Sequence, residues 1–413
     1  MYNHYKLNKT IIFIFLFITL LIAYFFNENS SGGAYPDFLM RVGIINSFNS
    51  DFYETFLNYN NFPDRHSPLI LILISGLYKI GLNLDSVRFL HLFLVPCLVI
   101  ITYKCFLSCF GNKYNNIFFL IASTIFLSPI IRSISIWPDS RLLGLLFFIS
   151  SLFYFLEFKK KHKYQYCIYN TVLLILSSYI SPNFAVFFLY FFYYYFKHYH
   201  LSKKLFVILF INLVLSLPMI FYLFILNVNF LLIPAINEVH LKERLNPANK
   251  ILIISTLVFF YYIPILLEGY VFKLLKRLQN FKNILITVIF FIILAFFFSY
   301  SFDYTGGGIF FKLSHILFKN DYFFLIISLV SMLFISQVFT INFNNILLFL
   351  VLIISNPHLT IYHKYYDPLL MILFFTLFQY NFDIKKIINT KLVINFYSFS
   401  IFFLIVNYLR SAF

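Results

Sequence analysis

Residues 11–26 read IIFIFLFITLLIAYFF and contain no charged side chain. A helix that crosses a bilayer needs about 20 predominantly apolar residues, and this run approaches that length. The whole chain has the same character, because 61% of its residues are hydrophobic and 11% are charged, whereas a soluble domain has about 25% charged residues. These numbers exclude a water-soluble globular fold. They predict an all-α, polytopic membrane protein.

Apolar runs of this kind are expected to be helices, because lipid offers no hydrogen-bond partner to an open backbone. The shorter run 67–80 contains Gly76 and ends in Lys79, so we predict an interfacial helix there. We expect a single transmembrane domain over residues 1–413, whose first outer loop, 27–85, carries amphipathic interfacial helices. About thirteen spans are predicted, at residues 10–26, 86–107, 117–131, 141–158, 165–180, 183–197, 205–226, 250–269, 282–300, 321–339, 345–355, 368–380 and 391–409.

The net charge of +16 is distributed unevenly over the predicted loops. Basic clusters at 159–163, 197–204 and 273–282 fall on one side of the membrane, and most of the 15 acidic residues fall on the other. The positive-inside rule assigns the basic side to the cytoplasm. We therefore expect a multi-pass protein of the bacterial cytoplasmic (inner) membrane with a cytoplasmic N-terminus. The charge reflects topology and does not indicate nucleic-acid binding.

Several acidic side chains of the outer face have a structural interpretation. Asp51 and Glu54 have the spacing of a capping box, which satisfies the first N–H groups of a helix. Asp85 and Asp321 each precede an apolar run and are expected to be N-caps. Asp139, in WPDSRLL, fits an N-cap and a functional role equally well.

Asp37 is the acidic residue with the strongest functional interpretation. It follows Pro36 at the membrane boundary and lies four residues before Arg41. On a helix this spacing favours an ion pair between the two side chains. The alternative is a partly desolvated carboxylate that serves as a catalytic base. The residues alone leave both interpretations open.

Five segments together resemble the GT-C superfamily of integral-membrane glycosyltransferases, and in particular the lipid A aminoarabinose transferases and protein O-mannosyltransferases. In that pattern a Pro-Asp-Glu motif opens the first outer loop, and this chain has Pro36 and Asp37 but Phe38 in place of the Glu. The other matches lie around His66, Asp139 and Lys364 and loosely at Glu238 and His240. The segments are GGAYPDFLMRVGI (32–44), FPDRHSPLILIL (62–73), SPIIRSISIWPDSRLL (128–143), NEVHLKERL (237–245) and HKYYDPLLMIL (363–373).

The resemblance implies a GT-C-like fold and a transferase of surface polysaccharide or glycolipid synthesis. Such an enzyme moves a sugar from a polyprenyl phosphate or diphosphate to an acceptor hydroxyl of a glycan or glycolipid on the outer face. Asp37 would take the proton of that hydroxyl, and basic side chains would stabilise the leaving phosphate. For each basic candidate the alternative is snorkelling to the interface, and Arg65 and Lys364 are the two favoured for the phosphate. The basic candidates are Arg41, Arg65, Arg132, Arg141 and Lys364. The implied substrate-binding residues are Arg41, Arg65, His66, Arg132, Asp139, Arg141, Glu238, His240, Lys364 and Tyr365.

Two further sets of side chains have a functional and a structural interpretation. Three histidines, His66, His240 and His363, with Asp64 or Glu238 allow a zinc site, but loop histidines that form hydrogen bonds are expected more often. The missing second acid of the family motif leaves open whether a divalent metal takes part, and no other cofactor is predicted. Among the aromatic residues, those expected in outer loops are candidates for stacking on a sugar, namely Tyr35, Trp137, Tyr304, Tyr362 and Tyr365.

Two other functions fit the same sequence features. A polymerase of O-antigen repeat units would also be polytopic and would also work on the outer face. A flippase or transporter of lipid-linked saccharide belongs to a different class, in which internal repeats and charges at the bilayer midplane are common. We recognise no internal repeat, and the charges fall at the ends of the predicted spans.

Overall fold

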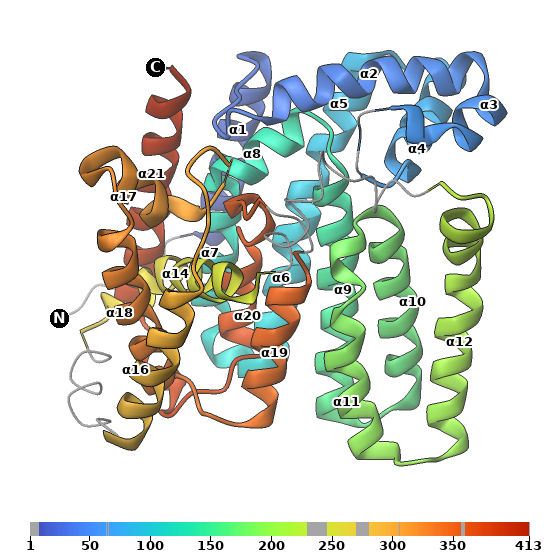
Figure 1. Ribbon diagram of the computed structural model, residues 1–413. Coiled ribbons are helices and arrows are strands. Elements are labelled where there is room, and N and C mark those ends of the chain that lie inside the picture. The colour runs from blue at the N-terminus through green and yellow to red at the C-terminus, as the bar shows by residue number, and fades with distance from the viewer. Residues whose placement is uncertain are drawn as a thin grey trace. The chain divides into compact units, whose positions relative to one another are not determined.

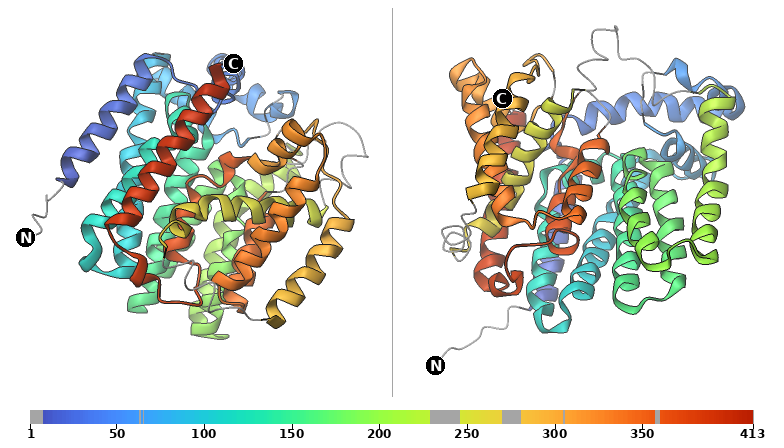
Figure 2. Two further views of the ribbon diagram at one scale, coloured as in Figure 1. Left: turned by 90° about the vertical axis from the view of Figure 1, so that its left-hand side faces the viewer. Right: turned by 60° about the horizontal axis from the view of Figure 1, so that its bottom comes forward.

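The computed structural model describes residues 8–62, 64, 66–228, 246–269, 281–304, 306–356 and 360–412. By their internal packing, residues 1–233 with 397–413 form one compact unit and residues 234–396 form a second, and each unit is described by itself. Most of the described residues are helical, and the one bridge between extended residues among them joins Phe339 to Tyr380 (Figure 1 and Figure 2). The predicted all-α class is thus confirmed, while a single domain stays a prediction.

The first unit contains most of the helices. Helix α21, Thr390–Ala412, begins in the second unit and ends in the first. The other α-helices of the first unit are α1 Lys9–Phe25, α2 Ala34–Ser50, α3 Phe52–Leu57, α4 Leu69–Lys79, α5 Leu84–Leu92, α6 Leu94–Phe110, α7 Asn115–Ser123, α8 Pro129–Ile136, α9 Ser140–Lys161, α10 Tyr164–Ile180, α11 Phe187–Tyr199 and α12 Lys203–Ile220. Those of the second unit are α14 Pro247–Leu266, α16 Phe281–Phe296, α17 Gly308–Phe318, α18 Tyr322–Val338, α19 Phe343–Ile354 and α20 Leu369–Thr376.

The thirteen predicted spans are not confirmed, although each predicted range contains helix. Within the described residues, five helical stretches are long and apolar enough to cross a membrane, or six if the bent pair Asn112–Leu127 and Pro129–Ile136 is one span. The five are Leu84–Phe110, Ser140–Lys161, Lys203–Ile225, Pro247–Leu266 and Thr390–Arg410. Others are shorter, such as α1 with 17 residues. The apolar helices are those of a protein that associates with a bilayer.

The bent pair replaces the straight span that we predicted over 117–131. The two parts meet at an angle of 61°. The bend has a local cause, because Pro129 has no N–H to donate to the preceding turn and is well suited to the first turn of a new helix. The Ser128 side chain accepts a hydrogen bond from the N–H of Ile131 and so caps α8. Helix α8 therefore turns away from α7.

The expected first outer loop is indeed largely helical, with α2, α3 and α4 between residues 34 and 79. The predicted interfacial helix at 67–80 corresponds to α4, whose 11 residues are too few to cross a bilayer. Helices α2 and α4 pack on a shared apolar core that includes Ile44, Phe48, Ile70 and Ile74. This core holds the first outer loop on the rest of the unit, and the amphipathic character of the loop is consistent with that packing.

The capping predictions are partly right. Asp51 accepts a hydrogen bond from the N–H of Glu54 at 2.9 Å and caps α3 as expected. The prediction for Asp85 is wrong, because Asn83 caps α5 and Asp85 pairs with Arg88 one turn later. Asp321 occupies the N-cap position of α18, as predicted, but its side chain makes no capping hydrogen bond, and its carboxylate contacts His315 Nε2 at 2.6 Å. Helix α17 was not predicted.

Small and polar residues bring α9 and α10 close together. Ser151 and Asn170 exchange three hydrogen bonds of 2.8–2.9 Å between the two helices. The Ser177 hydroxyl donates to the Gly144 carbonyl at 2.7 Å. Such contacts are the usual basis of close helix packing within a membrane, where apolar burial alone provides little driving force.

Candidate functional site

Four charged side chains from three separate segments form what we call the buried charge cluster. Arg41 comes from α2, Asp64 precedes α4, and Asp139 and Arg141 lie at the start of α9. Arg41 Nε donates to Asp64 Oδ2 at 2.9 Å, and Arg41 Nη1 donates to Asp139 Oδ2 at 2.8 Å. Arg141 Nε and Nη2 donate to the two oxygens of Asp139 at 2.7 Å each. The cluster thus joins residues about a hundred positions apart in the chain.

The two charge signs balance within the cluster, which is what makes its burial possible. The side chains of Arg41, Asp64 and Asp139 are 2–3% exposed. Burial alone would raise the pKa of Asp139, but Arg141 and Arg41 outweigh it and hold that pKa well below its usual range. Burial alone would lower the pKa of Arg41, but Asp139 and Asp64 raise it above its usual value. Removing any one partner would leave an uncompensated buried charge.

Asp139 combines the two roles that its sequence left open. Its side chain accepts from the N–H of Arg141 at 2.9 Å and caps the N-terminus of α9. A carboxylate is also favoured there by the helix dipole. The same carboxylate binds Arg41 and Arg141, so the beginning of α9 is tied to α2. Capping is confirmed, and the second role is electrostatic.

Asp37 and His66 lie beside this cluster. Asp37 is in the first turn of α2 and half-buried, and its charge contributes to the raised pKa of Arg41. The ion pairs of Arg41 run to Asp64 and Asp139, partners that the sequence did not predict. The backbone N–H of His66 donates to Asp64 Oδ1 at 3.0 Å. Tyr59 closes this loop by donating to the His66 carbonyl at 3.1 Å.

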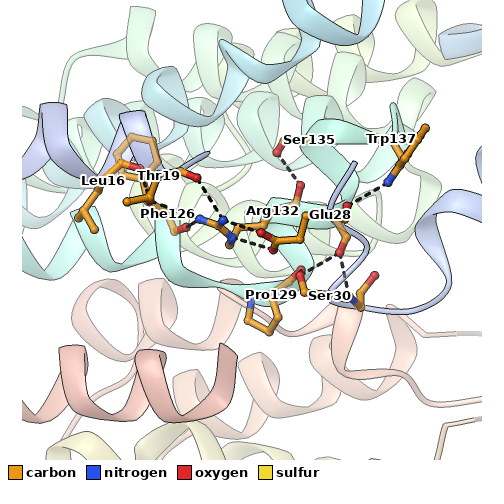
Figure 3. Close-up of polar contacts among 11 residues, drawn as sticks. Leu16, Thr19, Glu28, Ser30, Phe126, Pro129, Arg132, Ser135 and Trp137 are labelled. Atoms are coloured by element: carbon orange, nitrogen blue, oxygen red, sulfur yellow. Dashed lines mark hydrogen bonds and ion pairs between the residues drawn. The ribbon is translucent and has the colours of Figure 1, made fainter. Parts of the chain in front are cut away.

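A second polar cluster surrounds Glu28, just after α1 (Figure 3). Arg132 donates from Nε and Nη2 to the two carboxylate oxygens of Glu28 at 2.8 and 2.6 Å. Arg132 also donates to the carbonyls of Phe126 and Thr19 at 3.3 Å each. The pair therefore links the end of α1 to the bend between α7 and α8.

Snorkelling to the interface is the wrong interpretation for Arg132 and Arg141. Arg132 and Arg141 are only 5% and 6% exposed. Each faces a carboxylate, Glu28 for Arg132 and Asp139 for Arg141. Charge-assisted hydrogen bonds to a carboxylate stabilise each guanidinium group in place of the water that it would contact at the interface.

Trp137 lies between the two clusters in the chain, because Arg132 precedes it and Asp139 follows it. Its Nε1 donates to the Glu28 carbonyl at 3.0 Å. The guanidinium carbon of Arg88 lies 3.9 Å from the centre of its ring, and the ring of Tyr35 lies 4.6 Å from it. Trp137 is 6% exposed, whereas Tyr35 is 41% exposed. Of these two rings, both candidates for stacking on a sugar, Tyr35 is the accessible one.

Lys364 and Tyr365 belong to the second unit, in the short 3-10 turn His363–Tyr365. Both are half-buried, and the ammonium of Lys364 lies 4.6 Å from the centre of the Tyr362 ring. Because His363 Nε2 accepts from the backbone N–H of Ile309 at 3.0 Å, the neutral ring carries its proton on Nδ1, which lies 3.2 Å from the Tyr261 hydroxyl. This contact agrees with a hydrogen-bonding loop histidine.

Three of the predicted site residues, Arg65, Glu238 and His240, lie outside the described residues. The sequence suggests Asp64 only as a possible metal ligand and suggests no role for Glu28 or Arg88. The sequence contains one indication of a role for Asp64, namely its position in the FPDRHSPL segment. Glu28 had none, because its partner Arg132 lies 104 positions away. Arg88 had one local signal, its spacing of three residues from Asp85, but its contacts with Asn27, Ile136 and Trp137 are distant in the chain.

Within the part of the chain that the structure describes, no three His, Cys, Asp or Glu side chains gather in a way that could hold a metal ion. No protein family, curated protein or solved structure matches this chain. The function is therefore argued from the residues and their geometry.

Proposed function

We propose that this chain is a membrane glycosyltransferase that moves a sugar from a polyprenyl phosphate or diphosphate carrier to an acceptor hydroxyl at the outer face of the bacterial cytoplasmic membrane. The observation that carries the proposal is the gathering of three motif segments. Arg41 on α2, Asp64 in the loop before α4 and the start of α9 meet in the buried charge cluster, and Asp37 lies beside it, one turn before Arg41. These are the segments that carry the resemblance to GT-C enzymes in the first unit.

In the proposed reaction Asp37 is the general base. Its carboxylate takes the proton of the acceptor hydroxyl while the acceptor oxygen bonds to the anomeric carbon of the sugar. The bond between that carbon and the phosphate oxygen breaks, and the phosphate leaves on the polyprenyl carrier. General base catalysis of this kind contributes about 10²–10⁴-fold in rate.

The buried charge cluster has a positioning role in this scheme. Arg41 lies one turn beyond Asp37 on α2, and its guanidinium is held on Asp64 and Asp139. Because these ion pairs connect α2 to α9, they fix the position of the first turn of α2, which carries Asp37. Arg41 and Arg141 are engaged with carboxylates, so positive charge for the leaving phosphate is expected from Arg65, another basic candidate of the same motif segments.

The test compares Asp37→Asn with Asp51→Asn, an exposed aspartate that caps α3. Cells that express each variant as their only copy are extracted, and their lipid-linked sugars are measured by mass spectrometry. Asp37→Asn should lower sugar transfer at least about 100-fold and leave the lipid-linked sugar accessible to an external, membrane-impermeant glycosidase. Asp51→Asn should behave like the wild type, and equal membrane levels of both variants confirm insertion.

The same measurement separates the alternatives. A flippase that has lost function would leave the lipid-linked sugar on the inner leaflet, protected from the external glycosidase. A repeat-unit polymerase would leave single repeat units on the cell surface. Wild-type transfer by Asp37→Asn would remove Asp37 from the role of base.

A further inference from the structure

Four helices of the first unit bring their basic ends together. The turn at residues 162–163 connects α9 to α10, and the turn at 200–202 connects α11 to α12. Figure 1 shows both turns at the lower end of these helices, and the right-hand view of Figure 2 brings that end forward. We call this region the basic end. It consists of Lys160, Lys161, His162, Lys163, Lys197, His198, His200, Lys203 and Lys204, all of them exposed.

The two turns are in direct contact with each other. The rings of His162 and His198 stack in parallel, with centres 4.8 Å apart and an angle of 8° between their planes. Tyr164 donates its hydroxyl proton to the Lys204 carbonyl at 3.1 Å. The positive groups of four helix ends therefore form one continuous surface rather than separate patches.

Negative charge is nearly absent from this surface. Between residues 157 and 204 the only acidic residue is Glu157, which is buried, accepts from the Ser108 hydroxyl at 2.8 Å and pairs with Lys161. Desolvation lowers the pKa of His198, and the charges of His162, Lys204 and His200 lower it further. The contributions of His162, Lys204 and His200 to the lowered pKa agree with a positive potential at this surface, where only Lys161 has a carboxylate partner between residues 157 and 204.

The positions of the lysines are unusual for helix ends. Helix α10 begins after Lys163, and α12 begins with Lys203 and Lys204, where the helix dipole disfavours positive charge by about 0.3–1 kcal/mol for each residue. Neither helix has a side-chain cap or an acidic residue in its first turn. The positive-inside rule accounts for the side of the membrane on which lysines occur. The rule does not explain why α10 and α12 begin at lysines and lack a side-chain cap.

The basic end also lies at the level of lipid headgroups. The stretch Lys203–Ile225 is one of the membrane-crossing candidates, and only 11% of it is buried within the protein. Most of its apolar side chains are turned outward, among them Phe206 at 57% and Phe210 at 64% exposed, whereas Leu205 and Ile208 are buried. Because lipid must cover these rings, the lysines at the beginning of the same helix lie where the hydrocarbon ends.

We propose that the basic end binds the phosphate groups of anionic lipids. A phosphate at the two turns would complement the uncapped N-termini of α10 and α12 and the lysines beside them. Each basic residue near an anionic membrane surface contributes about 1 kcal/mol to such binding. The proposal does not depend on the glycosyltransferase activity.

The test uses the full chain, purified in a neutral detergent, and native mass spectrometry of bound lipid. Phosphatidylglycerol and phosphatidylcholine of equal chain length are titrated separately, and inorganic phosphate is added in a third series. The variant is Lys203→Gln/Lys204→Gln. The matched control is Lys385→Gln/Lys386→Gln, a second pair of exposed neighbouring lysines with the same change of charge.

The wild type and the control should bind phosphatidylglycerol in preference to phosphatidylcholine. The Lys203→Gln/Lys204→Gln variant should bind phosphatidylglycerol about 30-fold more weakly, the factor that corresponds to two lysines. If this variant does not fold, Lys160→Gln/Lys163→Gln tests the same surface with the same expected loss.

Three results would overturn the proposal. The first is equal binding of the two lipids by the wild type. The second is an equal loss in the variant and in the control, which would mean that only the net charge matters. The third is full displacement of phosphatidylglycerol by inorganic phosphate at the same concentration, which would make the site one for free phosphate.

Discussion

Replacing Asp139 by Asn tests the buried charge cluster, because the change removes one charge and preserves the shape of the side chain. Asn is as good an N-cap as Asp, so the cap on α9 should persist. What is lost is the negative partner of Arg41 and Arg141, which are 2% and 6% exposed. Breaking a buried pair by removing one partner costs about 3–5 kcal/mol, and we expect Asp139→Asn to lose this much unfolding free energy.

The assay uses the fluorescence of Trp137, the single tryptophan of the chain, which lies two residues from Asp139 and is 6% exposed. The detergent-purified protein is unfolded with denaturant, and the midpoint is followed by this signal. The control is Asp51→Asn, which also keeps an N-cap but has an exposed side chain, so it should change the free energy by less than about 0.5 kcal/mol. An Asp139→Asn loss below about 1 kcal/mol, or one equal to the control, would refute the role of the cluster.

The difference in unfolding free energy between the wild type and Asp139→Asn should also depend on pH. Because the pKa of folded Asp139 lies well below its usual range, its contribution to stability is complete above the pKa of the unfolded residue, about 3.9. It is lost as the pH falls through the folded pKa. The amide of the variant does not titrate, so the gap between the wild type and Asp139→Asn should narrow below about pH 4. A gap that stays constant down to pH 3 would contradict the assignment.

Two further predictions concern packing in the first unit. Glu28→Gln should lower the free energy of unfolding by about 3–5 kcal/mol, because Arg132 would keep a buried charge without its bidentate partner. Unfolding followed by Trp137 fluorescence measures this loss. A loss under about 1 kcal/mol would show that the pair contributes little. Gly144→Ala should cost about 1–3 kcal/mol, since the new methyl group would lie 2.6 Å from the Ser181 Cβ. Its control, Gly43→Ala, meets no atom within 4 Å and should be neutral or slightly stabilising, and equal unfolding midpoints for the two alanine variants would contradict close packing at Gly144.

The local features of the chain were predictable from its sequence because they depend on neighbouring residues. The helical class follows from long apolar runs, and the ends of α9, predicted at 141–158 and observed at Ser140–Lys161, follow from Asp139 and from the lysines near residue 160. Asp51 caps α3 as its spacing indicates. The thirteen predicted spans are not confirmed among the described residues, because apolar composition predicts helix but does not set its length. Pro129, for example, divides one expected span into two helices.

The partners of the charged residues were decided only by the tertiary structure. Helical spacing offered Asp37 as one possible partner of Arg41, and its charge does contribute to the raised pKa of Arg41, but the carboxylates that bind the Arg41 guanidinium at 2.8–2.9 Å lie 23 and 98 positions away. Arg132 likewise binds Glu28, 104 positions distant. A sequence determines by itself which segments are apolar and where helices begin, because these depend on local hydrogen bonds and solvation. Which carboxylate a buried guanidinium contacts depends on how helices pack, since burial makes every such charge require a partner within hydrogen-bond distance.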